Sequence, residues 1–424
     1  MSQSGVSRRG FLKASAAAVP VVAAINATGV YAAGDDVIKV ALIGAGGRGS
    51  GALDNFISAA KRAGLQTKVV AIADVQKDRA EGNARKHDVP MDHVFTDFSG
   101  YKKVVATDAD YVILATSPNF RPVHLEAAVR AGKNVFMEKP VAVDPPGIRR
   151  IIAAGELAKQ KGLGIVAGTQ RRHEKPYRET ADKIAQGALG RIMSARVWWC
   201  GGRLWYRGQG ANESDAMYMV RNWVSFTEMS GDHIVEQHVH NLDIANWFIG
   251  RPPVSALGFG GRARRKTGNQ FDFFSIDFDY GDDVTVHSMC RQISGCYDRV
   301  AEYVVGTNGA TWGNGGSFKM IEPKSVQVGK YPEGNPYEVE HFDLINSVRA
   351  GKPLNEAQAV AEATMAAIMG RISAYTGQLV RWSDCMSNTN SPYYNLTCTP
   401  TAEDFEKGDV TAPEDDVVAV PGKD

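Results

Sequence analysis

The fold of this chain is decided by the stretch VIKVALIGAGGRG, residues 37–49. Its first seven residues predict a buried strand, and residues 50–63 have the apolar spacing of a helix. Between the two, Gly44, Gly46 and Gly49 form the pattern G-x-G-x-x-G. The first glycine allows a tight turn, the second lets a diphosphate approach the backbone, and the third lets helix and strand pack closely. Because a helix N-terminus also offers free N–H groups to an anion, the stretch predicts a dinucleotide site that includes Arg48.

A second predicted strand, residues 68–73, ends in Asp74. An acid at this place accepts a hydrogen bond from the ribose 2′-hydroxyl and repels a 2′-phosphate, so NAD is the favoured cofactor. Lys77 and Arg79 follow closely and leave NADP open. The region is typical of a doubly wound α/β fold, and the alternative interpretation is the same fold with an empty or different nucleotide site.

Two further predicted strands, 111–115 and 135–137, end in short polar segments. The first leads into Thr116 and Asn119, with His124 on the helix that follows. The second delivers the tripeptide Glu-Lys-Pro at 138–140. Since open α/β sheets bind ligands at the carboxyl ends of their strands, we expect these side chains, with Glu138 and Lys139 among them, to face the cofactor.

The Glu-Lys-Pro tripeptide together with G-x-G-x-x-G resembles the Gfo/Idh/MocA oxidoreductases, named after glucose-fructose oxidoreductase and inositol dehydrogenase. The likeness runs from about residue 37 to the C-terminal helices. It implies that Lys139 lies against the nicotinamide and polarises the reacting hydroxyl or carbonyl, and that Glu138 helps to seat the cofactor. It also implies a second, α+β domain with an open, mainly antiparallel sheet, which covers the active site with one face and packs on a second subunit with the other.

A second family element is the segment EQHVHNLD, residues 236–243. If it forms one helix, positions 236, 240 and 243 share a face. The resemblance implies that His240 is the general base that takes the hydroxyl proton, and that Glu236, where the family usually has aspartate, orients the imidazole. Because glutamate is one methylene longer, either the helix sits further from the nicotinamide or His238 shares the role.

The same segment leaves a metal site open as an alternative. His233, His238 and His240 lie close to Glu236 and Asp243, and imidazole and carboxylate suit zinc or manganese. Their spacing is no recognised ligand signature and hydride transfer needs no metal, so we predict none. Structural roles are the simpler interpretation of His233 and His238.

Two segments are candidates for the substrate side. Residues 168–173, GTQRRH, resemble the family segment that turns from the first domain toward the substrate, which implicates Arg172 and His173. Arg221, Asn222 and Trp223 lie in a stretch crowded with aromatic residues and offer a stacking surface and hydrogen-bond donors to a sugar ring. Aromatic clusters are more often core than ligand cradle, so a packing role for this stretch stays open.

Composition excludes several classes of function. The chain of 424 residues has 48 Lys and Arg against 47 Asp and Glu, so no field of one sign draws it to nucleic acid or anionic lipid. Five cysteines make no dense disulfide framework, although Cys290/Cys296 and Cys385/Cys398 are close enough in sequence to bridge. Strands are predicted at 271–280 and 283–288, and amphipathic helices at 340–349 and 355–376. The acidic final stretch from 402 either wraps the surface or stays mobile.

The N-terminus has the pattern of an export signal. Residues 7–13, SRRGFLK, put two arginines before an apolar run at 14–27, which resembles a twin-arginine signal with cleavage after Ala32 or Ala33. The run is too short and too weakly hydrophobic for a stable membrane span. We predict a signal peptide at 1–33, an NAD(P)-binding Rossmann domain at 34–168, and a substrate-binding and oligomerisation domain at 169–424.

These features predict an oxidoreductase that the twin-arginine machinery exports to the periplasm. It is expected to move hydride to or from a CH–OH group of a sugar or cyclitol. Because free NAD is scarce outside the cytoplasm, the cofactor is expected to stay tightly bound. The alternatives are an NAD-dependent glycoside hydrolase and a non-catalytic dinucleotide-binding sensor. By resemblance, the protein is a homo-oligomer.

Overall fold

The computed structural model describes residues 37–315, 317–321 and 326–422, all of which belong to one compact unit. The predicted signal peptide at 1–33 lies outside the described residues. In the described part of the chain, no helix combines the length and the apolar character that crossing a bilayer requires.

A parallel sheet with the strand order β3-β2-β1-β4-β5-β6 forms the first half of this unit. β1, β4 and β5 are apolar and almost entirely buried, as strands with helices on both faces must be. The order reverses between β1 and β4, the place where doubly wound sheets bind nucleotides. The elements are β1 (Val37–Ile43), α2 (Gly47–Arg62), β2 (Gln66–Ala73), α3 (Lys77–Lys86), β3 (Val94–Phe95), α4 (Gly100–Val105), β4 (Tyr111–Leu114), α5 (Arg121–Arg130), β5 (Asn134–Met137), α6 (Pro145–Lys161) and β6 (Ile165–Ala167).

A second sheet has the order β13-β12-β11-β7-β10-β9-β8-β14. Its neighbouring strands are antiparallel apart from β7 and β10, which run parallel. Alternate residues of β9 and β10 are buried, because only one face of these strands meets a core. The strands are β7 (Ile192–Gly201), β8 (Ser255–Gly261), β9 (Phe273–Asp279), β10 (Thr285–Gln292), β11 (Arg299–Gly306), β12 (Gly309–Gly313), β13 (Phe318–Ile321) and β14 (Val380–Arg381). The predicted fold class, a Rossmann domain with an α+β domain, is confirmed.

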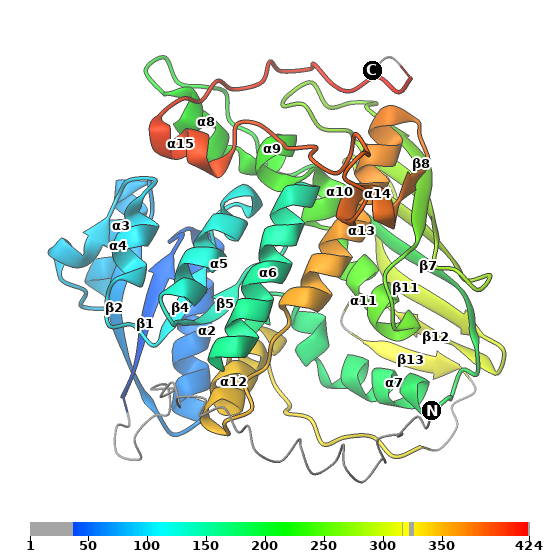
Figure 1. The fold of residues 1–424 in the computed structure, drawn as a ribbon, viewed down its shortest axis with the longest axis horizontal. Helices are drawn as coiled ribbons and strands as arrows, with labels where there is room; N and C mark the ends of the chain where they lie inside the picture. Colours follow the sequence, from blue (N-terminus) through cyan, green and yellow to red (C-terminus); the bar gives the residue numbers. More distant parts are fainter. Residues whose placement is uncertain (1–36, 316, 322–325, 423–424) are drawn as a thin grey trace, which may run out of the picture. The chain divides into compact units, whose positions relative to one another are not determined.

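The long helix α13 joins the two halves. It packs against α6, α11 and β8, and Figure 1 shows it between the two sheets. Because it has neighbours on several sides it is buried nearly all round, rather than amphipathic as predicted. α12 packs against α2, so the chain returns to the first sheet near its end. The helices of this half are α7 (Lys175–Ala185), α8 (Asp215–Arg221), α9 (Thr227–Ser230), α10 (His233–Glu236), α11 (Val239–Ile249), α12 (Pro336–Arg349), α13 (Ala357–Thr376), α14 (Trp382–Met386) and α15 (Ala402–Lys407).

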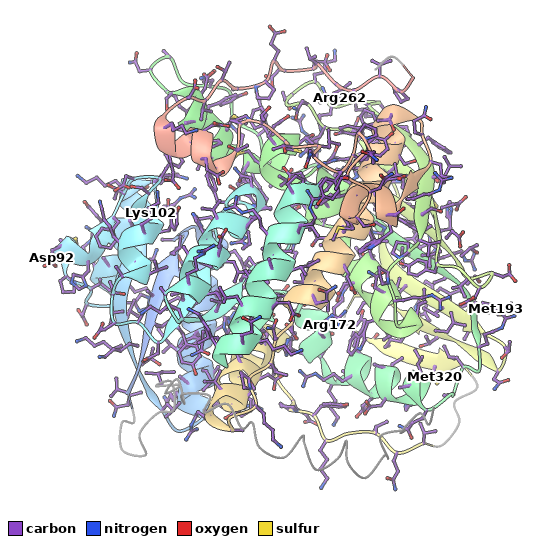
Figure 2. The ribbon with its side chains drawn as sticks, in the orientation of Figure 1. Asp92, Lys102, Arg172, Met193, Arg262 and Met320 are labelled. Atoms are coloured by element: carbon purple, nitrogen blue, oxygen red, sulfur yellow. The ribbon has the colours of Figure 1, made fainter. Side chains whose placement is uncertain are left out.

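The acidic final stretch wraps the surface as far as residue 422. Phe405 of α15 packs on Phe98 and Phe120, with ring centres 5.2 and 5.1 Å away. Further along, Arg262 lies beneath the C-terminal segment in Figure 2 and pairs with Asp416 at 2.8 Å. Of the two alternatives expected for the stretch from residue 402, the structure therefore shows the one in which it wraps the surface.

All five cysteines are free, so neither of the two bridges considered from the sequence forms. Cys290 is buried in β10, whereas Cys296 is exposed in the segment that follows it. The thiol of Cys398 contacts Arg371 at 3.6 Å rather than Cys385. Short separation along the chain does not bring the members of these pairs together.

Candidate active site

The glycine turn between β1 and α2 has two positions that only glycine can occupy. Gly44 has φ +94°, and a Cβ there would lie 2.6 Å from the carbonyl carbon of Ala115. A Cβ on Gly49 would lie 1.8 Å from the Gly44 oxygen. Both side chains are excluded by backbone, as a turn that passes close to a ligand and to a neighbouring strand requires. The first N–H groups of α2 have no partner within the helix and are available to an anion.

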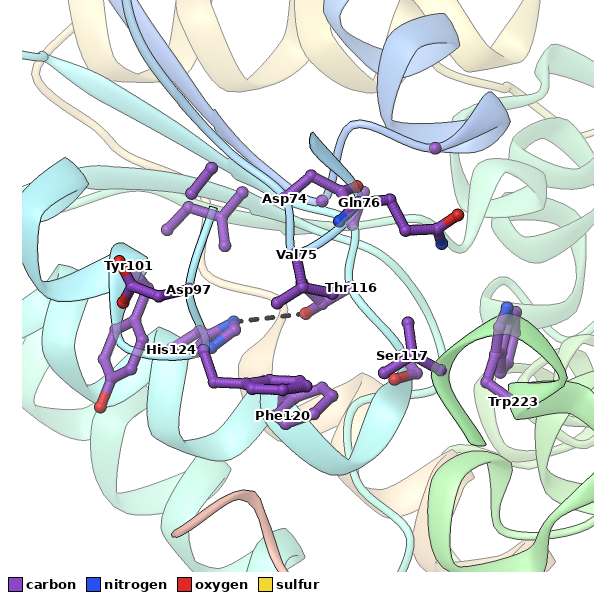
Figure 3. Close-up of a pocket in the computed structure, with 17 residues that line it drawn as sticks. Asp74, Val75, Gln76, Asp97, Tyr101, Thr116, Ser117, Phe120, His124 and Trp223 are labelled. Atoms are coloured by element: carbon purple, nitrogen blue, oxygen red, sulfur yellow. Dashed lines mark hydrogen bonds between the residues drawn. The ribbon is translucent and has the colours of Figure 1, made fainter. Parts of the chain in front are cut away.

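A cavity of about 620 Å³ lies beside this turn (Figure 3), and we call it the nucleotide cavity. Asp74 lines it, with one carboxylate oxygen accepting from the N–H of Ala45 (2.7 Å) and the other from the N–H of Gln76 (2.8 Å). Burial raises the pKa of Asp74. Thr116 and His124 line the same cavity, with Oγ1 and Nδ1 3.2 Å apart. Burial lowers the pKa of His124 to about 3, so its ring is neutral.

A second cavity of about 690 Å³ shares Ala115, Thr116 and Trp223 with the nucleotide cavity. The two cavities therefore adjoin at the junction of the domains, and together we call them the cleft. Because Lys139 lines the second one, we call it the lysine cavity. Its walls come from the glycine turn, from the loops after β4 and β5, and from α10 and α11.

Lys139 connects the two domains inside the lysine cavity. Its Nζ donates to the main-chain oxygen of Glu236 (2.7 Å) and to the Glu236 carboxylate (3.3 Å). Only 15% of the lysine side chain and 12% of the glutamate side chain are exposed. The ammonium is thus held by fixed protein acceptors rather than by water.

His240 lines the same cavity, and its imidazole stacks on the Trp199 indole with ring centres 5.6 Å apart. Its Nδ1 is buried and has no hydrogen-bond partner in the described part of the chain. Burial, and then the charges of Lys139, Arg171 and Arg48, hold the pKa of His240 well below its usual value. The imidazole is therefore neutral at pH 7 and free to accept a proton, as a general base must be.

Arg48 joins the glycine turn to the wall of the lysine cavity. Its guanidinium pairs with Glu138 and with Glu340 (3.0 Å) and lies 4.9 Å from the ring centre of Tyr337. Burial, and then the neighbouring Glu138, raise the pKa of Glu340 well above its usual value. A Cβ on Gly168 would lie 2.4 Å from the Glu138 carboxylate, so glycine at that position leaves room for the acid.

Residues 236–243 do not form one helix, contrary to the expected shared face. α10 and α11 are separate, with Glu236 at the end of the first and His240 near the start of the second. Glu236 reaches Lys139 instead of His240. Asp243 forms a bidentate pair with Arg172, at 2.8 and 2.9 Å. The acid therefore fixes the lysine rather than orienting the imidazole.

The other two histidines of this region hold elements together. His238 is fully buried and contacts Ser288 Oγ at 2.7 Å, and burial lowers its pKa to about 3. Nδ1 of His233 lies 3.0 Å from the Asp232 carboxylate. Neither ring lines the lysine cavity, so His238 is not placed to share the role of His240. Within residues 37–422, leaving out the undescribed gaps, no group of three or more His, Cys, Asp or Glu is arranged to hold a metal ion.

Arg172 and His173, expected on the substrate side, line neither cavity. Arg172 is engaged by Asp243, and His173 is buried between Asp343 (2.7 Å) and Glu356 (3.2 Å). Although burial opposes it, these two carboxylates raise the pKa of His173 to about 9. Both side chains satisfy buried acids, and a sequence pattern does not show those partners.

Three further expected residues also serve the local fold. Arg221 pairs with Glu213, Asn222 bonds the main chain of Arg207 (2.8 and 2.9 Å), and Asn119 lies outside both cavities. Of the tripeptide 221–223, only Trp223 faces the cleft, where it lines both cavities.

The structure brings together most of the expected cofactor and catalytic residues. The nucleotide cavity is lined by Gly44, Gly46, Asp74, Thr116 and His124, while Gly49 packs behind it. The lysine cavity is lined by Arg48, Thr116, Glu138, Lys139, Trp223, Glu236 and His240.

Three lysine-cavity residues with charged, amide or phenol side chains were missed by sequence reasoning: Arg121, Gln170 and Tyr337. Arg121 follows the loop after β4, where the rule on strand ends already places ligand contacts. Gln170 precedes the arginine pair of the segment 168–173 and belongs to the same turn. Tyr337 comes from α12, about 290 residues after the glycine turn, and no local signal links the two.

Two family models match the chain. The one described as "Oxidoreductase family, NAD-binding Rossmann fold" matches residues 38–168, and the "GFO/IDH/MocA C-terminal domain" matches residues 177–311. Together they span more than half of the chain. The chain belongs to the Gfo/Idh/MocA oxidoreductases. The resemblance inferred from the two motifs is confirmed, and this family member is an NAD-dependent oxidoreductase.

Individual relatives of this Gfo/Idh/MocA protein are distant. The inositol 2-dehydrogenase of Pseudomonas savastanoi pv. phaseolicola is 25% identical over 332 residues, which is 74% of this chain and 87% of the relative. The scyllo-inositol 2-dehydrogenase (NAD(+)) of Bacillus subtilis is 24% identical over 333 residues, with the same shares. A solved structure, the WlbA dehydrogenase from Bordetella pertussis in complex with NADH and UDP-GlcNAcA, has the same fold, with a TM-score of 0.63 and 18% identity over 81% of this chain and 98% of that one.

Proposed function

We propose that this protein is exported and transfers hydride between NAD and a hydroxyl-bearing carbon of a sugar or cyclitol. The observation that carries the proposal is that Lys139, Glu236 and His240 line one cavity, which adjoins the nucleotide cavity. The two distant relatives that are inositol dehydrogenases support a polyhydroxylated ring as the substrate.

The residues of the cleft fit NAD. Gly44 and Gly49 allow a tight turn in which no side chain fits, and the start of α2 offers N–H groups to the diphosphate. Asp74 is placed for the ribose hydroxyl and repels a 2′-phosphate. Arg48 and Glu138 would hold the nicotinamide end. When bound, NAD supplies the carbon that accepts or donates the hydride.

Side chains of the protein would transfer the hydroxyl proton and stabilise the negative charge that develops on the reacting oxygen. Nζ of Lys139 donates a hydrogen bond to the reacting oxygen and stabilises the negative charge that develops on it. The neutral imidazole of His240 takes the hydroxyl proton during oxidation and returns it during reduction. Oε1 of Gln170 and Oε2 of Glu236 are buried acceptors without a partner, so they suit the remaining hydroxyls of a polyol.

Export and cofactor retention belong to the same proposal. The two arginines at 8 and 9 before an apolar run support transport to the periplasm by the twin-arginine machinery. NAD would then travel bound and be recycled in place, with one sugar oxidised and another carbonyl reduced. Slow release is supported by α15, because its Phe405 packs on Phe98 and Phe120, which line the nucleotide cavity.

A homo-oligomer is proposed from the open face of the second sheet. Leu257 and Phe259 on β8 and Met289 on β10 are 52%, 66% and 40% exposed. An apolar face of this kind supports contact with a second copy of the chain. The balanced charge of the chain gives no support to a nucleic-acid partner.

The proposal is tested on the mature protein purified without added nucleotide. We expect denaturation to release NAD(H), and a sugar or cyclitol to change the near-ultraviolet absorbance of the bound nicotinamide. Lys139→Met should slow that change at least about 100-fold, whereas Lys86→Met, at an exposed lysine paired with Asp54, should leave it unaltered. Equal rates in wild type and Lys139→Met would contradict the catalytic part, and absence of released NAD(H) would contradict retention.

A further inference from the structure

Arg121 is the first residue of α5 and lines the lysine cavity, yet its side chain is fully buried. Nη2 donates to the main-chain oxygen of Thr116 at 2.7 Å. Nε and Nη1 are buried and have no hydrogen-bond partner among the residues that the structure describes. Neither atom meets a carboxylate, although buried arginines are ordinarily paired.

A buried guanidinium without a counter-charge is costly to fold, so its presence needs a reason. Burial lowers the pKa of Arg121 to about 10, against which the charge of the nearby Glu138 acts. With that pKa the group stays protonated at pH 7. The wall of the cavity therefore includes a positively charged guanidinium of which, among the described residues, only Nη2 donates a hydrogen bond.

The other cations of the lysine cavity are already paired. Arg48 is bound to Glu138, and Lys139 to Glu236 at 3.3 Å. Arg48 also pairs with Glu340, so among the described residues Arg121 is the cation of this cavity that no carboxylate binds. His240 adds no negative charge, and an oxidised nicotinamide beside these groups would add positive charge. Arg121 is therefore without a counter-charge of its own.

We propose that Arg121 binds a carboxylate of the substrate, so that the enzyme acts on a sugar acid such as a uronate or an aldonate. The proposal rests on the proposed hydride transfer and specifies its substrate class. A monoanion matches the single unmatched guanidinium, whereas a phosphate monoester would leave about one further charge unmatched. Arg121 lines the lysine cavity and not the nucleotide cavity, which separates it from the diphosphate position at the start of α2.

The neighbouring groups suit the rest of such a substrate. Gln170 brings an unpartnered acceptor to the cavity, and His240 and Lys139 bring the proton acceptor and the donor already described. A sugar acid can place its carboxylate on Arg121 while a ring or chain hydroxyl lies between Lys139 and His240. A neutral sugar of the same configuration would leave the guanidinium desolvated and unpaired, which is a basis for rejecting it.

The test compares acid and neutral partners of one configuration: D-glucuronate with D-glucose, D-galacturonate with D-galactose, and D-gluconate with sorbitol. Hydride transfer is followed by nicotinamide absorbance, and binding by tryptophan fluorescence of the NAD-loaded protein. At least one acid should exceed its neutral partner about 10- to 100-fold in kcat/KM or affinity, the range expected of a hydrogen bond to a charged group.

Arg121→Met keeps the approximate length of the side chain and removes its charge. We expect the acid-to-neutral ratio to fall about 10- to 100-fold in this variant, and Arg121→Lys to recover part of it. The matched control is Arg130→Met, because Arg130 ends the same helix, is exposed and pairs with Glu126. The control should keep the wild-type ratio. Thermal unfolding should show Arg121→Met to be at least as stable as wild type, since it removes a buried unpaired charge.

The possible outcomes separate this inference from the proposed function. If neutral sugars are oxidised at the same rate as the acids, and Arg121→Met leaves the acid-to-neutral ratio unchanged, the carboxylate assignment is wrong while hydride transfer stands. Acids that bind through Arg121 without any change in nicotinamide absorbance would uphold the carboxylate site and contradict the reaction. If Arg121→Met weakens NAD binding as much as acid binding, the arginine belongs to the cofactor and the inference is wrong. Absence of binding by all six compounds would contradict both.

Discussion

The sharpest test of the cofactor site compares two glycines of one turn. A Cβ on Gly49 would lie 1.8 Å from the oxygen of Gly44, about 1.5 Å inside ordinary contact, whereas a Cβ on Gly47 meets nothing within 4 Å. The Gly44 oxygen cannot move freely, because that residue has φ +94° and its N–H bonds the Ala73 oxygen at 2.8 Å. Gly49→Ala must therefore shift the turn that receives the diphosphate.

Forced overpacking of this kind costs about 1–3 kcal/mol, which corresponds to a loss of NAD affinity of about 5- to 150-fold if the strain is relieved in the empty turn. Gly47→Ala lies in the first turn of α2 and should keep NAD affinity within about twofold. Affinity is measured by tryptophan-fluorescence titration of protein stripped of nucleotide, with thermal unfolding as the check on folding. Equal NAD affinity in the two variants would refute the assignment of this turn to the diphosphate.

Three further outcomes follow from single groups. Asp74→Ser removes the carboxylate that repels a 2′-phosphate and should raise the NADP-to-NAD affinity ratio at least about tenfold in the same titration. Because the pKa of His240 is lowered, its imidazole stays neutral as the pH falls through 6.5, and the rate of hydride transfer should decline only below that pH. A pH–rate profile with its midpoint at or above pH 6.5 would contradict this. Glu302→Gln leaves the buried Arg171 without its carboxylate partner and should lower the free energy of unfolding, measured in urea, by about 3–5 kcal/mol. Asp54→Asn breaks an exposed pair with Lys86 and should lower it by less than about 1 kcal/mol.

Most strands of the first sheet could be predicted because each is a short apolar run that ends in a polar turn, whereas the two-residue β3 was not predicted. Predicted strand 37–43 coincides with β1, and predicted strand 68–73 falls within β2. Such strands are buried on both faces, so their sequence alone marks them. The order of the strands in the second sheet could not be derived, because β7 pairs with β10 and β11 across about a hundred residues and no local pattern records that pairing.

The site was predictable where a residue stands at the end of a strand, and not where a buried partner decides its role. Asp74 and Lys139 follow β2 and β5 directly, and both line the cleft. Arg172 and His173 sit in an equally suggestive turn, but their charges are taken by acids from α11, α12 and the segment before α13. Arg121 is the opposite case. It is singled out because, among the described residues, its Nε and Nη1 have no hydrogen-bond partner.

The break between α10 and α11 changes the interpretation of the catalytic groups. On a continuous helix, an acid at 236 would face His240 and its charge would stabilise the protonated imidazole. In the observed arrangement Glu236 contacts Lys139 through both its carboxylate and its main-chain oxygen, and the neighbours of His240 are cations. The lysine is consequently held in place by two acceptors, while the lowered pKa of the histidine keeps its ring neutral. Because the donor is fixed and the base is neutral before any substrate arrives, the cavity is organised in advance for removing a proton from a hydroxyl, and the chemical step requires little reorganisation.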